Sequence, residues 1–542
     1  MPSGIKPTVY LLKSEVGSPA DVFKDSSRLR SKESHGVSLF YKNSPTHPPK
    51  WAPFLSDNFE VDQGNFKNAS AYAAIVMKVD NRFFVIPLGM GVHLVDMTKI
   101  EYNFGLKIAI NCIPKDEIRQ MDLTTPEANS QKTKKQAVRS STTEEFGVNK
   151  QKDILRGVVG KLPENHVFGE RIEGKDSVRT SKTISSVEDL QNLCSRLLLE
   201  SNKDSYKTDF PWIDNMAIIN DPTVLENLYS DLVAAIKNNT TDNISLSAPE
   251  FVDNLYDYEG FVFTGNGKRR SGKDAYPFPT IENVIGEIGT EGINDLGRDA
   301  LFKTHKVCLR DADGNYHFNW PLYRCLNWEI EKDGSKFILS EGHWYRIESN
   351  FYNQVTQYFN SHFQSNLGLP LVPADIKRES DYNAHACETN PDNFLFDLGH
   401  PSARTKFFGQ DKNEFCDIFD SSGKRFVHVK PGKNSPDISH LLRQGVFSGR
   451  SLKLTPETAS TLVQHLNDYG CAPGIISLPF SPNEYKVVFA LILESNQRLD
   501  IPFFSKASFM DASQFSLEII GYEVQFGYLI KDIPILAAEE EV

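Results

Sequence analysis

The sequence predicts a mixed α+β protein of several domains, with antiparallel and mixed sheets and with helices between them. Residues Ala71–Gly91 and Cys325–Glu348 contain apolar runs separated by tight turns, which is typical of β-hairpins. Residues Val187–Asn202 and Thr223–Asn239 instead carry apolar side chains at helical spacing. A chain of 542 residues is long enough for roughly two to four domains.

The composition predicts a globular protein that does not cross a membrane. Hydrophobic residues make up 39% of the chain and charged residues 24%, as in ordinary water-soluble domains. No apolar run reaches the roughly 18 residues of a membrane helix, and the N-terminus lacks a signal-peptide pattern. The seven cysteines form no C-x-x-C pair, which indicates reduced thiols. We therefore expect a cytoplasmic protein with no membrane partner.

Residues 1–120 are expected to form an N-terminal α/β domain with an antiparallel sheet. Strands are predicted at Val9–Lys13, Val37–Lys42 and Leu106–Asn111, because these runs are apolar and rich in β-branched or aromatic residues. The hairpin described above adds two more strands, and its turn is Asp80-Asn81.

Residues 121–152 change in character and are expected to be a basic polar linker or loop. They are rich in Thr, Ser, Gln and Lys. The net charge of −12 argues against a protein coated for non-specific nucleic-acid binding, but it leaves room for a local basic surface. This segment is therefore either a solvated linker or a surface that contacts phosphates through Lys132, Lys134, Lys135 and Arg139.

A helical domain is expected at residues 153–245 and an antiparallel β-rich region at 246–372. Within the latter, Gly265–Lys273 has the glycine and lysine spacing of a phosphate-binding loop. However, Asp274 stands where a Ser or Thr should follow, and two nearby prolines prevent the long helix that such a loop precedes. We expect no nucleotide cofactor. The loop's cations are instead candidates for nucleic-acid contact: Lys268, Arg269, Arg270 and Lys273.

The C-terminal region, residues 373–542, contains a predicted strand, tight turn, second strand and helix within Asp411–Arg450. Successive side chains of a strand alternate between its faces, so His428 and Lys430 must share one face. A four-residue loop pairs Phe419 with Lys424 and brings Asp417 to that face, whereas a three-residue loop brings Glu414 there. We expect Asp417.

This strand–hairpin–strand–helix pattern resembles the core of the PD-(D/E)xK nucleases. In that superfamily, an acid on the first strand and an acid two residues before a lysine on the second strand bind a divalent metal, and the lysine orients water. The resemblance implies that Asp417 and Glu379, the latter on a preceding helix, hold Mg²⁺ or Mn²⁺. It further implies that Lys430 and Gln444, the latter on the following helix, take part in catalysis.

His428 departs from that pattern, because it stands where the superfamily has an acid. As a catalytic candidate it would be a ligand for a softer metal or a general base near neutral pH. Two other possibilities remain open. One is a zinc site, although the spacing of its candidate ligands matches no known framework. Those ligands are His385, Cys387, Cys416 and His428. The other possibility is that the fold is catalytically inactive.

Several stretches together resemble one uncharacterised bacterial family of this length. They include PKWAPFL, NFGLKIAIN, YKTDFPWIDN, GHWYRIE and SHLLRQGVFS. Members are distributed sporadically and are often found near restriction and phage-defence genes. This resemblance implies a role in defence against phages or mobile elements, by association. Taken with the nuclease-like pattern of the C-terminal region, it leads us to expect a metal-dependent nuclease that acts on foreign nucleic acid, with DNA favoured over RNA, and with other defence proteins or a second copy as partners. The alternative is an inactive nuclease-like sensor or scaffold that binds nucleic acid or a phage protein.

Overall fold

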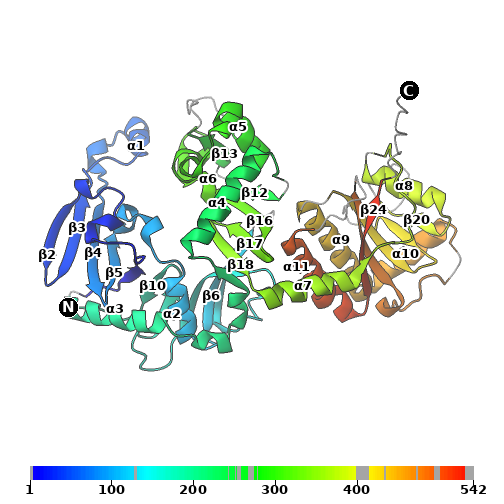
Figure 1. Cartoon of the computed structure of the whole chain (residues 1–542), viewed down its shortest axis with the longest axis horizontal. Coiled ribbons are helices and arrows are strands. Elements are labelled where there is room, and N and C mark those ends of the chain that lie inside the picture. The colour runs from blue at the N-terminus through cyan, green and yellow to red at the C-terminus, as the bar shows by residue number, and fades with distance from the viewer. Residues whose placement is uncertain are drawn as a thin grey trace. The chain divides into compact units, whose positions relative to one another are not determined.

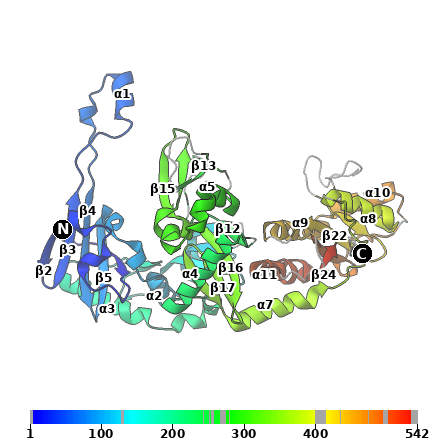
Figure 2. The same ribbon diagram turned by 45° about the horizontal axis from the view of Figure 1, so that its top comes forward.

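The computed structural model (Figures 1 and 2) folds as two compact units, which are described separately. The first comprises residues 1–124, 132–148 and 153–213, and the second comprises 125–131, 149–152 and 214–542. The residues that the structure describes are 4–126, 131–241, 243–250, 252, 258–265, 274–277, 279–376, 378–397, 414–432, 435–471, 474–493 and 501–531.

The first unit is organised around a ten-stranded sheet with the order β2-β3-β4-β5-β1-β10-β9-β8-β6-β7. The hairpin predicted within Ala71–Gly91 is confirmed as β4 and β5 of this sheet, because Val79 pairs with Arg82, and Asp80 and Asn81 have φ of 49° and 68°. These positive angles suit the two-residue turns that match strand twist. The strands are β1 (Thr8–Leu11), β2 (Arg30–Ser34), β3 (Val37–Asn43), β4 (Ala71–Val79), β5 (Arg82–Gly89), β6 (Ile118–Thr125), β7 (Gln131–Ser141), β8 (Ile154–Lys161), β9 (Arg171–Gly174) and β10 (Ser177–Thr180).

Three α-helices accompany this sheet: α1 (Ala52–Phe59), α2 (Phe104–Cys112) and α3 (Val187–Ser201). In Figure 2, α1 lies beyond the ends of β3 and β4. The strand predicted at Leu106–Asn111 is wrong, since these residues belong to α2. The helix is buried on most of its surface, so its sequence lacks the polar face that would have revealed it. A Cβ at Gly105 would lie 1.8 Å from the backbone oxygen of Ser177, so glycine allows this close approach.

Two expected segments differ from the structure in this unit. The predicted linker at 121–152 contains most of β6 and all of β7, the latter at one edge of the sheet. The predicted helical domain at 153–245 begins with β8, β9 and β10 of the same sheet. Its first predicted helix is confirmed as α3, where the Ser186 hydroxyl oxygen accepts a hydrogen bond from Asp189 N.

The second unit begins with two smaller sheets. One has the order β11-β18-β17-β16-β12 and the other β13-β14-β15. The hairpins predicted within Cys325–Glu348 are confirmed as β16, β17 and β18. The elements are β11 (Met216–Ile218), α4 (Pro222–Lys237), β12 (Ile244–Leu246), β13 (Tyr258–Thr264), α5 (Ile281–Asn294), β14 (Lys306–Asp311), β15 (Tyr316–Pro321), α6 (Leu322–Cys325), β16 (Leu326–Lys332), β17 (Ser335–Ser340) and β18 (His343–Ile347).

The C-terminal part of this unit holds a six-stranded mixed sheet with the order β19-β24-β23-β22-β21-β20. Strands β20, β21 and β22 are antiparallel neighbours, whereas β22, β23 and β24 run parallel. The elements are α7 (Ser349–His362), β19 (Phe363–Gln364), α8 (Glu379–Thr389), β20 (Asn393–Leu395), β21 (Ile418–Asp420), β22 (Arg425–Pro431), α9 (Ser435–Leu454), α10 (Pro456–Asp468), β23 (Lys486–Leu493), α11 (Phe503–Ala512) and β24 (Glu523–Ile530).

Helices α8 and α9 cover opposite faces of this sheet. Tyr382 and Ala386 of α8 pack in one core with Val427 and Val429 of β22. Leu441 and neighbouring residues of α9 pack with the other face of β22 and β23. The chain therefore passes from α8 through three antiparallel strands to α9 and then to the parallel strand β23.

Helix α11 is buried along nearly its whole length. Its first turn is held by Glu329 of β16, whose carboxylate accepts hydrogen bonds from Phe503 N at 2.7 Å and Phe504 N at 3.3 Å. Burial raises the pKa of Glu329, and Lys336 and the two backbone donors oppose this shift. The contact links the five-stranded sheet to a helix far along the chain.

Candidate metal centre

The site begins at the first turn of α8. Glu379 is the first residue of the helix, where a carboxylate is favoured by the partial positive charge of the helix N-terminus. Asn383 lies one turn later and therefore on the same side of the helix. Asn383 is fully buried, and its Nδ2 donates a hydrogen bond to Asp397 Oδ2 at 2.8 Å.

Two aspartates meet where β20 ends and β21 begins. Because these strands are antiparallel, Asp397, just after β20, lies beside Asp417, just before β21. The backbone nitrogens of Phe396 and Asp397 both donate to the Asp417 carbonyl oxygen, at 3.0 and 3.2 Å. Two carboxylates that are distant in sequence are thus brought together by strand pairing.

The hairpin between β21 and β22 differs from the predicted register. Asp420 pairs with Arg425, so the four-residue loop is Ser421–Lys424 rather than Asp420–Gly423. The first strand gains Asp420 and the second loses Lys424, so Phe419 pairs with Phe426 rather than with Lys424. Because this shift is two residues, the relation between the faces is unchanged. Asp417 lies outside the regular ladder, and its Oδ2 accepts a hydrogen bond from Val429 N at 2.7 Å.

The structure brings three of the predicted residues together and adds one that the sequence analysis missed. Glu379, Asp397 and Asp417 each offer a carboxylate oxygen, and these oxygens lie within 4.8 Å of one another. Lys430 Nζ lies 2.6 Å from Glu379 Oε1. We call these four residues the acidic site. Asp397 follows the apolar run FLF, and an aspartate at the end of a strand is the signal that could have revealed it.

Burial and mutual repulsion disfavour three negative charges in the acidic site. Burial raises the pKa of Asp417 well above its usual value, and the nearby carboxylates Glu414 and Glu379 add to this. Burial also raises the pKa of Glu379, although its ion pair with Lys430 opposes the shift. Burial alone would lower the pKa of Lys430, but the contact with Glu379 outweighs it and the pKa is raised. A bound cation would relieve this repulsion.

The donor set fits a hard divalent metal. Mg²⁺ and Mn²⁺ prefer oxygen ligands, and all three candidate ligands are carboxylates. Beside Asp397, the Asn383 Oδ1 atom is buried and has no hydrogen-bond partner among the described residues. An unpaired buried acceptor is costly, so its position beside the acids suits a hydrogen bond from a water on the metal.

His428 lies apart from these contacts. It is buried, its Nε2 is 3.3 Å from Ser448 Oγ on α9, and its ring stacks against Phe489 with centroids 6.0 Å apart. Burial, followed by the charge of Lys430, lowers the pKa of His428 to about 3. A neutral imidazole with that pKa is a weak general base near neutral pH. These contacts favour a packing role over the predicted role as ligand or base.

Gln444 and the candidate zinc ligands are not brought to the carboxylates by any contact in the described part of the chain. Gln444 Oε1 is buried on α9 and has no hydrogen-bond partner among the described residues. Among the described residues, the acids of the acidic site are the group whose ligand atoms lie close enough to hold a metal. The predicted zinc set does not form such a group: His385, Cys387, Cys416 and His428.

The predicted phosphate contacts on β7 are divided between its two faces. Alternation places Lys132 and Lys134 on one face, and Lys135 and Arg139 on the other. Lys135 Nζ donates to the carbonyl oxygen of Phe146 at 2.6 Å, so this cation is used within the fold. The other predicted group lies outside the described residues: Lys268, Arg269, Arg270 and Lys273.

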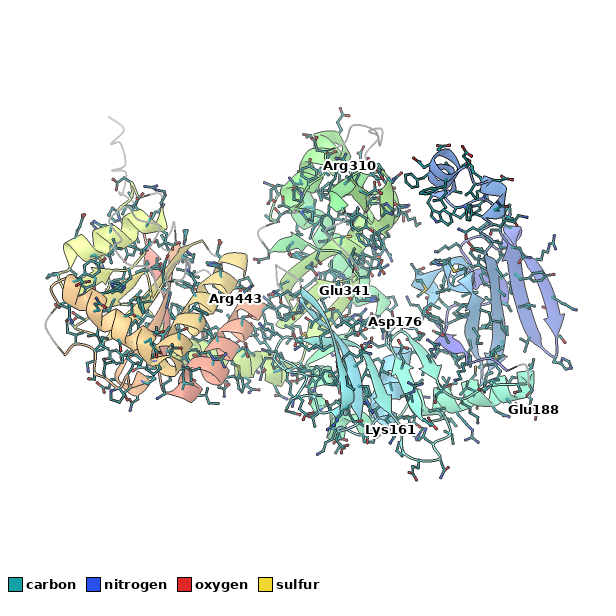
Figure 3. The ribbon with its side chains drawn as sticks, turned by 180° about the vertical axis from the view of Figure 1, so that it is seen from behind. Lys161, Asp176, Glu188, Arg310, Glu341 and Arg443 are labelled. Atoms are coloured by element: carbon teal, nitrogen blue, oxygen red, sulfur yellow. The ribbon has the colours of Figure 1, made fainter. Side chains whose placement is uncertain are left out.

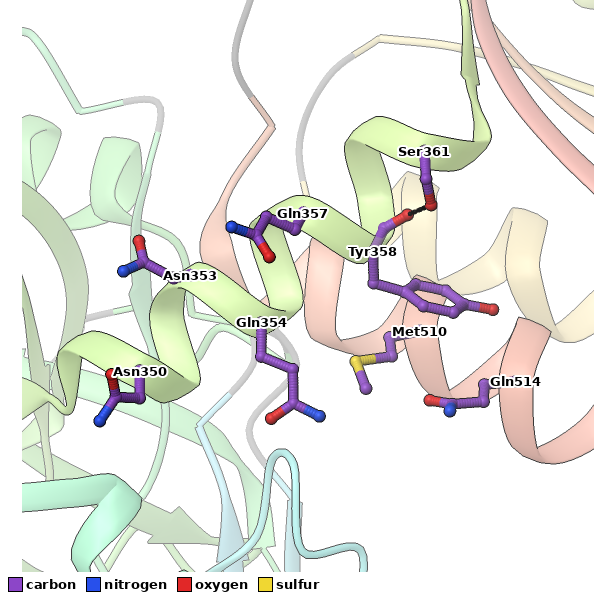
Figure 4. Close-up of a pocket in the computed structure, with 8 residues that line it drawn as sticks. All are labelled: Asn350, Asn353, Gln354, Gln357, Tyr358, Ser361, Met510 and Gln514. Atoms are coloured by element: carbon purple, nitrogen blue, oxygen red, sulfur yellow. Dashed lines mark hydrogen bonds between the residues drawn. The ribbon is translucent and has the colours of Figure 1, made fainter.

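A separate open cavity of about 620 Å³ lies along α7 and α11 (Figure 4). Its lining is mostly uncharged and amide-rich, and Ser361 Oγ donates to the Tyr358 carbonyl oxygen at 2.7 Å. No carboxylate or cation lines it, so it offers no acid–base or metal chemistry. The lining residues are Asn350, Asn353, Gln354, Gln357, Tyr358, Ser361, Met510 and Gln514.

The comparisons with known proteins identify a family but no function. No helix in the described part of the chain has the length and apolar character needed to cross a membrane. No curated protein matches the chain, and no solved structure matches it. One family model, described as a family of unknown function (DUF6119), matches residues 7–529. Since this match covers nearly the whole sequence, the chain belongs to the DUF6119 family.

Proposed function

We propose that the protein is a metal-dependent nuclease that hydrolyses phosphodiester bonds. The observation that supports this most strongly is the convergence of Glu379, Asp397 and Asp417 within 4.8 Å beside Lys430. Three carboxylate ligands, of which Asp397 and Asp417 are buried, lie next to one cation, and these are the components that metal-assisted phosphodiester hydrolysis requires. The resemblance to PD-(D/E)xK nucleases, noted from the sequence, points to the same chemistry.

Each side chain of the acidic site has a distinct role in this proposal. The three carboxylates bind Mg²⁺ or Mn²⁺, which when bound lowers the pKa of a water ligand and offsets charge on the phosphate. The Val429 N–H fixes the direction of the Asp417 carboxylate. Lys430 opposes the burial that raises the pKa of Glu379, and it supplies a positive charge next to the position of the scissile phosphate.

Asp397 supplies the carboxylate that the superfamily pattern expects at the position of His428. The resemblance places a carboxylate two residues before Lys430, but His428 faces Ser448 on α9 instead. Asp397 supplies a third carboxylate from the preceding strand, and Asn383 holds it. We propose that the acid has moved from one strand to its neighbour, so that the ligand count is kept.

The test is cleavage of plasmid and single-stranded DNA with Mg²⁺ or Mn²⁺. Asp417→Asn, Asp397→Asn and Lys430→Met should each lower the rate by about 100-fold or more, because each removes a charge that contacts metal or phosphate. Asp468→Asn at the end of α10 is the matched control, since this aspartate is exposed, and it should cleave like the wild type.

Two outcomes would contradict the proposal. If the wild type cleaves no substrate with either metal, the inactive sensor or scaffold becomes the better description. If Asp397→Asn cleaves at the wild-type rate while Asp417→Asn does not, the third ligand has been assigned wrongly.

We propose defence against foreign DNA as the cellular role, on the strength of the family resemblance described from the sequence. Bacteria carrying the wild-type gene should resist phages that infect bacteria carrying the Asp417→Asn gene. Equal plating of a broad phage panel on both hosts would argue against this role without affecting the proposed chemistry.

A further inference from the structure

Helix α9 carries a continuous row of exposed side chains on one side. His440, Arg443, Phe447 and Arg450 are all exposed and are spaced by three or four residues, so they follow one face of the helix. We call these four residues the α9 stripe. Phe447 is 45% exposed, so part of its ring faces solvent. Figure 3 labels Arg443 on this helix.

The charge of the α9 stripe is opposite to that of the whole protein. The chain has a net charge of −12, yet the exposed charged residues of α9 are all basic: Arg443, Arg450 and Lys453. Among the described residues, neither arginine of the stripe has an ionic partner, whereas Arg298 and Arg378 are paired with Glu226 and Asp381. Cations left unpaired on an acidic protein suit an anionic ligand.

The α9 stripe starts beside the acidic site. Helix α9 follows β22 closely, and Asp437 of its first turn is near enough for its charge to raise the pKa of Glu379. A Cβ on Gly432, just after β22, would lie 3.1 Å from Asp437 Oδ2, so the first turn of α9 is close to the end of the strand that carries Lys430. Burial lowers the pKa of His440, and the nearby charges of Lys430 and Arg443 lower it further. From His440 to Arg450 the helix rises about 15 Å. That length matches roughly four stacked nucleotides.

We infer that the α9 stripe binds single-stranded nucleic acid and guides it toward the acidic site. This inference rests on the proposed nuclease function. Guanidinium groups contact phosphates, and an exposed aromatic ring offers a surface on which an unpaired base can stack. Along one face of α9, Arg443 and Arg450 offer the phosphate contacts, and Phe447 between them offers the stacking surface. In a duplex the base faces are covered, so Phe447 would have no stacking partner there.

Fluorescence anisotropy tests this inference with labelled DNA and RNA strands of about 20 nucleotides, a length that exceeds one such site. EDTA is present, so that the probe is not cleaved. Arg443→Ala combined with Arg450→Ala should reduce the slope of log K against log salt by about 1.4, since each phosphate contact on a single strand contributes about 0.7. Phe447→Ala should weaken binding by about fivefold or more and leave that slope unchanged.

Arg196→Ala is the matched control, because Arg196 is an exposed arginine on α3, and it should bind like the wild type. Alanine has the highest helix propensity, so α9 should remain folded in the variants. The inference is overturned if neither strand binds, if the α9 variants bind like the wild type, or if a duplex binds equally well and Phe447→Ala has no effect. An acidic peptide that displaces the strand at an equal concentration of negative charge would show that the α9 stripe binds anions in general, and this would also overturn the inference.

The two proposals can fail separately. If the protein never cleaves but binds strands through the α9 stripe, the nuclease proposal is wrong and the nucleic-acid surface stands. If cleavage depends on Asp417 but the stripe variants bind with unchanged affinity, the nuclease proposal stands and the α9 inference is wrong.

Discussion

At the scale of single residues, burial decides which side chains of β22 carry charge. His428 and Lys430 are two positions apart on one strand. Lys430 reaches Glu379 and keeps its charge through that contact, whereas His428 is enclosed by Phe489, Gly445 and Ser448 and remains neutral. The lysine is therefore available for chemistry, and the imidazole contributes to packing.

The neutral state of His428 predicts a specific pH dependence of stability. Its pKa of about 3 in the folded protein lies below the ordinary 6.5, so the unfolded chain binds more protons between these values. The stability that this residue contributes is complete above pH 6.5 and is lost as the pH falls toward 3. Between pH 7 and pH 5 the loss should be about 2 kcal/mol.

Urea unfolding of the wild type and of His428→Leu at several pH values measures this difference. The variant should not show the loss of stability between pH 7 and pH 5 that protonation of His428 causes. Leucine leaves no buried hydroxyl unpaired, because Ser448 Oγ still donates a hydrogen bond to the Gly445 carbonyl oxygen. The variant should also retain metal-dependent cleavage. A folded variant with cleavage reduced by about 100-fold would restore the predicted role of His428 as base or ligand.

Residue by residue, the candidate site was partly predictable. Asp417, Glu379 and Lys430 could be named because a hairpin pattern and a resemblance pointed to them, and all three converge. Asp397 could not, because its neighbour in space is a residue on another strand, and strand pairing between β20 and β21 is invisible in local periodicity. Asn383 was missed for a similar reason, since its role depends on Asp397.

At the scale of elements, α9 packs closely on the sheet through a glycine. A Cβ on Gly445 would lie 2.4 Å from Phe489 Cε1 and 3.3 Å from His428 Cδ2, and both side chains are buried. Gly286 of α5 is also within a helix, but a Cβ there would meet nothing within 4 Å. The two glycines therefore provide a matched pair.

Gly445→Ala should destabilise the protein by about 1 to 3 kcal/mol, because overpacking outweighs the better helix propensity of alanine. Gly286→Ala should instead stabilise it by about 0.5 to 1 kcal/mol, since only the propensity changes. Urea midpoints of both variants give the comparison. Stabilisation by both substitutions would mean that α9 is not held as closely to Phe489 as the structure indicates.

Elements with a strong local signal could be predicted from the sequence. The β4–β5 hairpin was identified by Asp80-Asn81, whose positive φ angles suit the residues found there. Helix α2 was mistaken for a strand, because a buried helix has no polar face and its apolar run resembles a strand. Strand β7 was mistaken for a linker, because an exposed edge strand consists of the polar residues that also fill loops.

At the scale of the whole molecule, the acidic site belongs to the second of the two units. Calorimetry should therefore show that Mn²⁺ raises the unfolding temperature of one unit and leaves the other unchanged. At a hundredfold excess over its dissociation constant, the metal should stabilise its unit by about 2.7 kcal/mol. Asp397→Asn should remove the shift. A shift of both transitions, or of neither, would contradict the assignment of the metal to this site.

The contact between Glu329 and the start of α11 has a consequence for how the chain is made. Its two partners are separated by 174 residues of sequence. A ribosome adds roughly 5 to 20 residues each second, so the finished strand β16 waits about 10 to 35 s for its partner to emerge. During that interval the Glu329 carboxylate must remain hydrated and the surface that α11 covers must stay open. The contact between the five-stranded sheet and α11 therefore forms only after Phe503 and Phe504 have emerged.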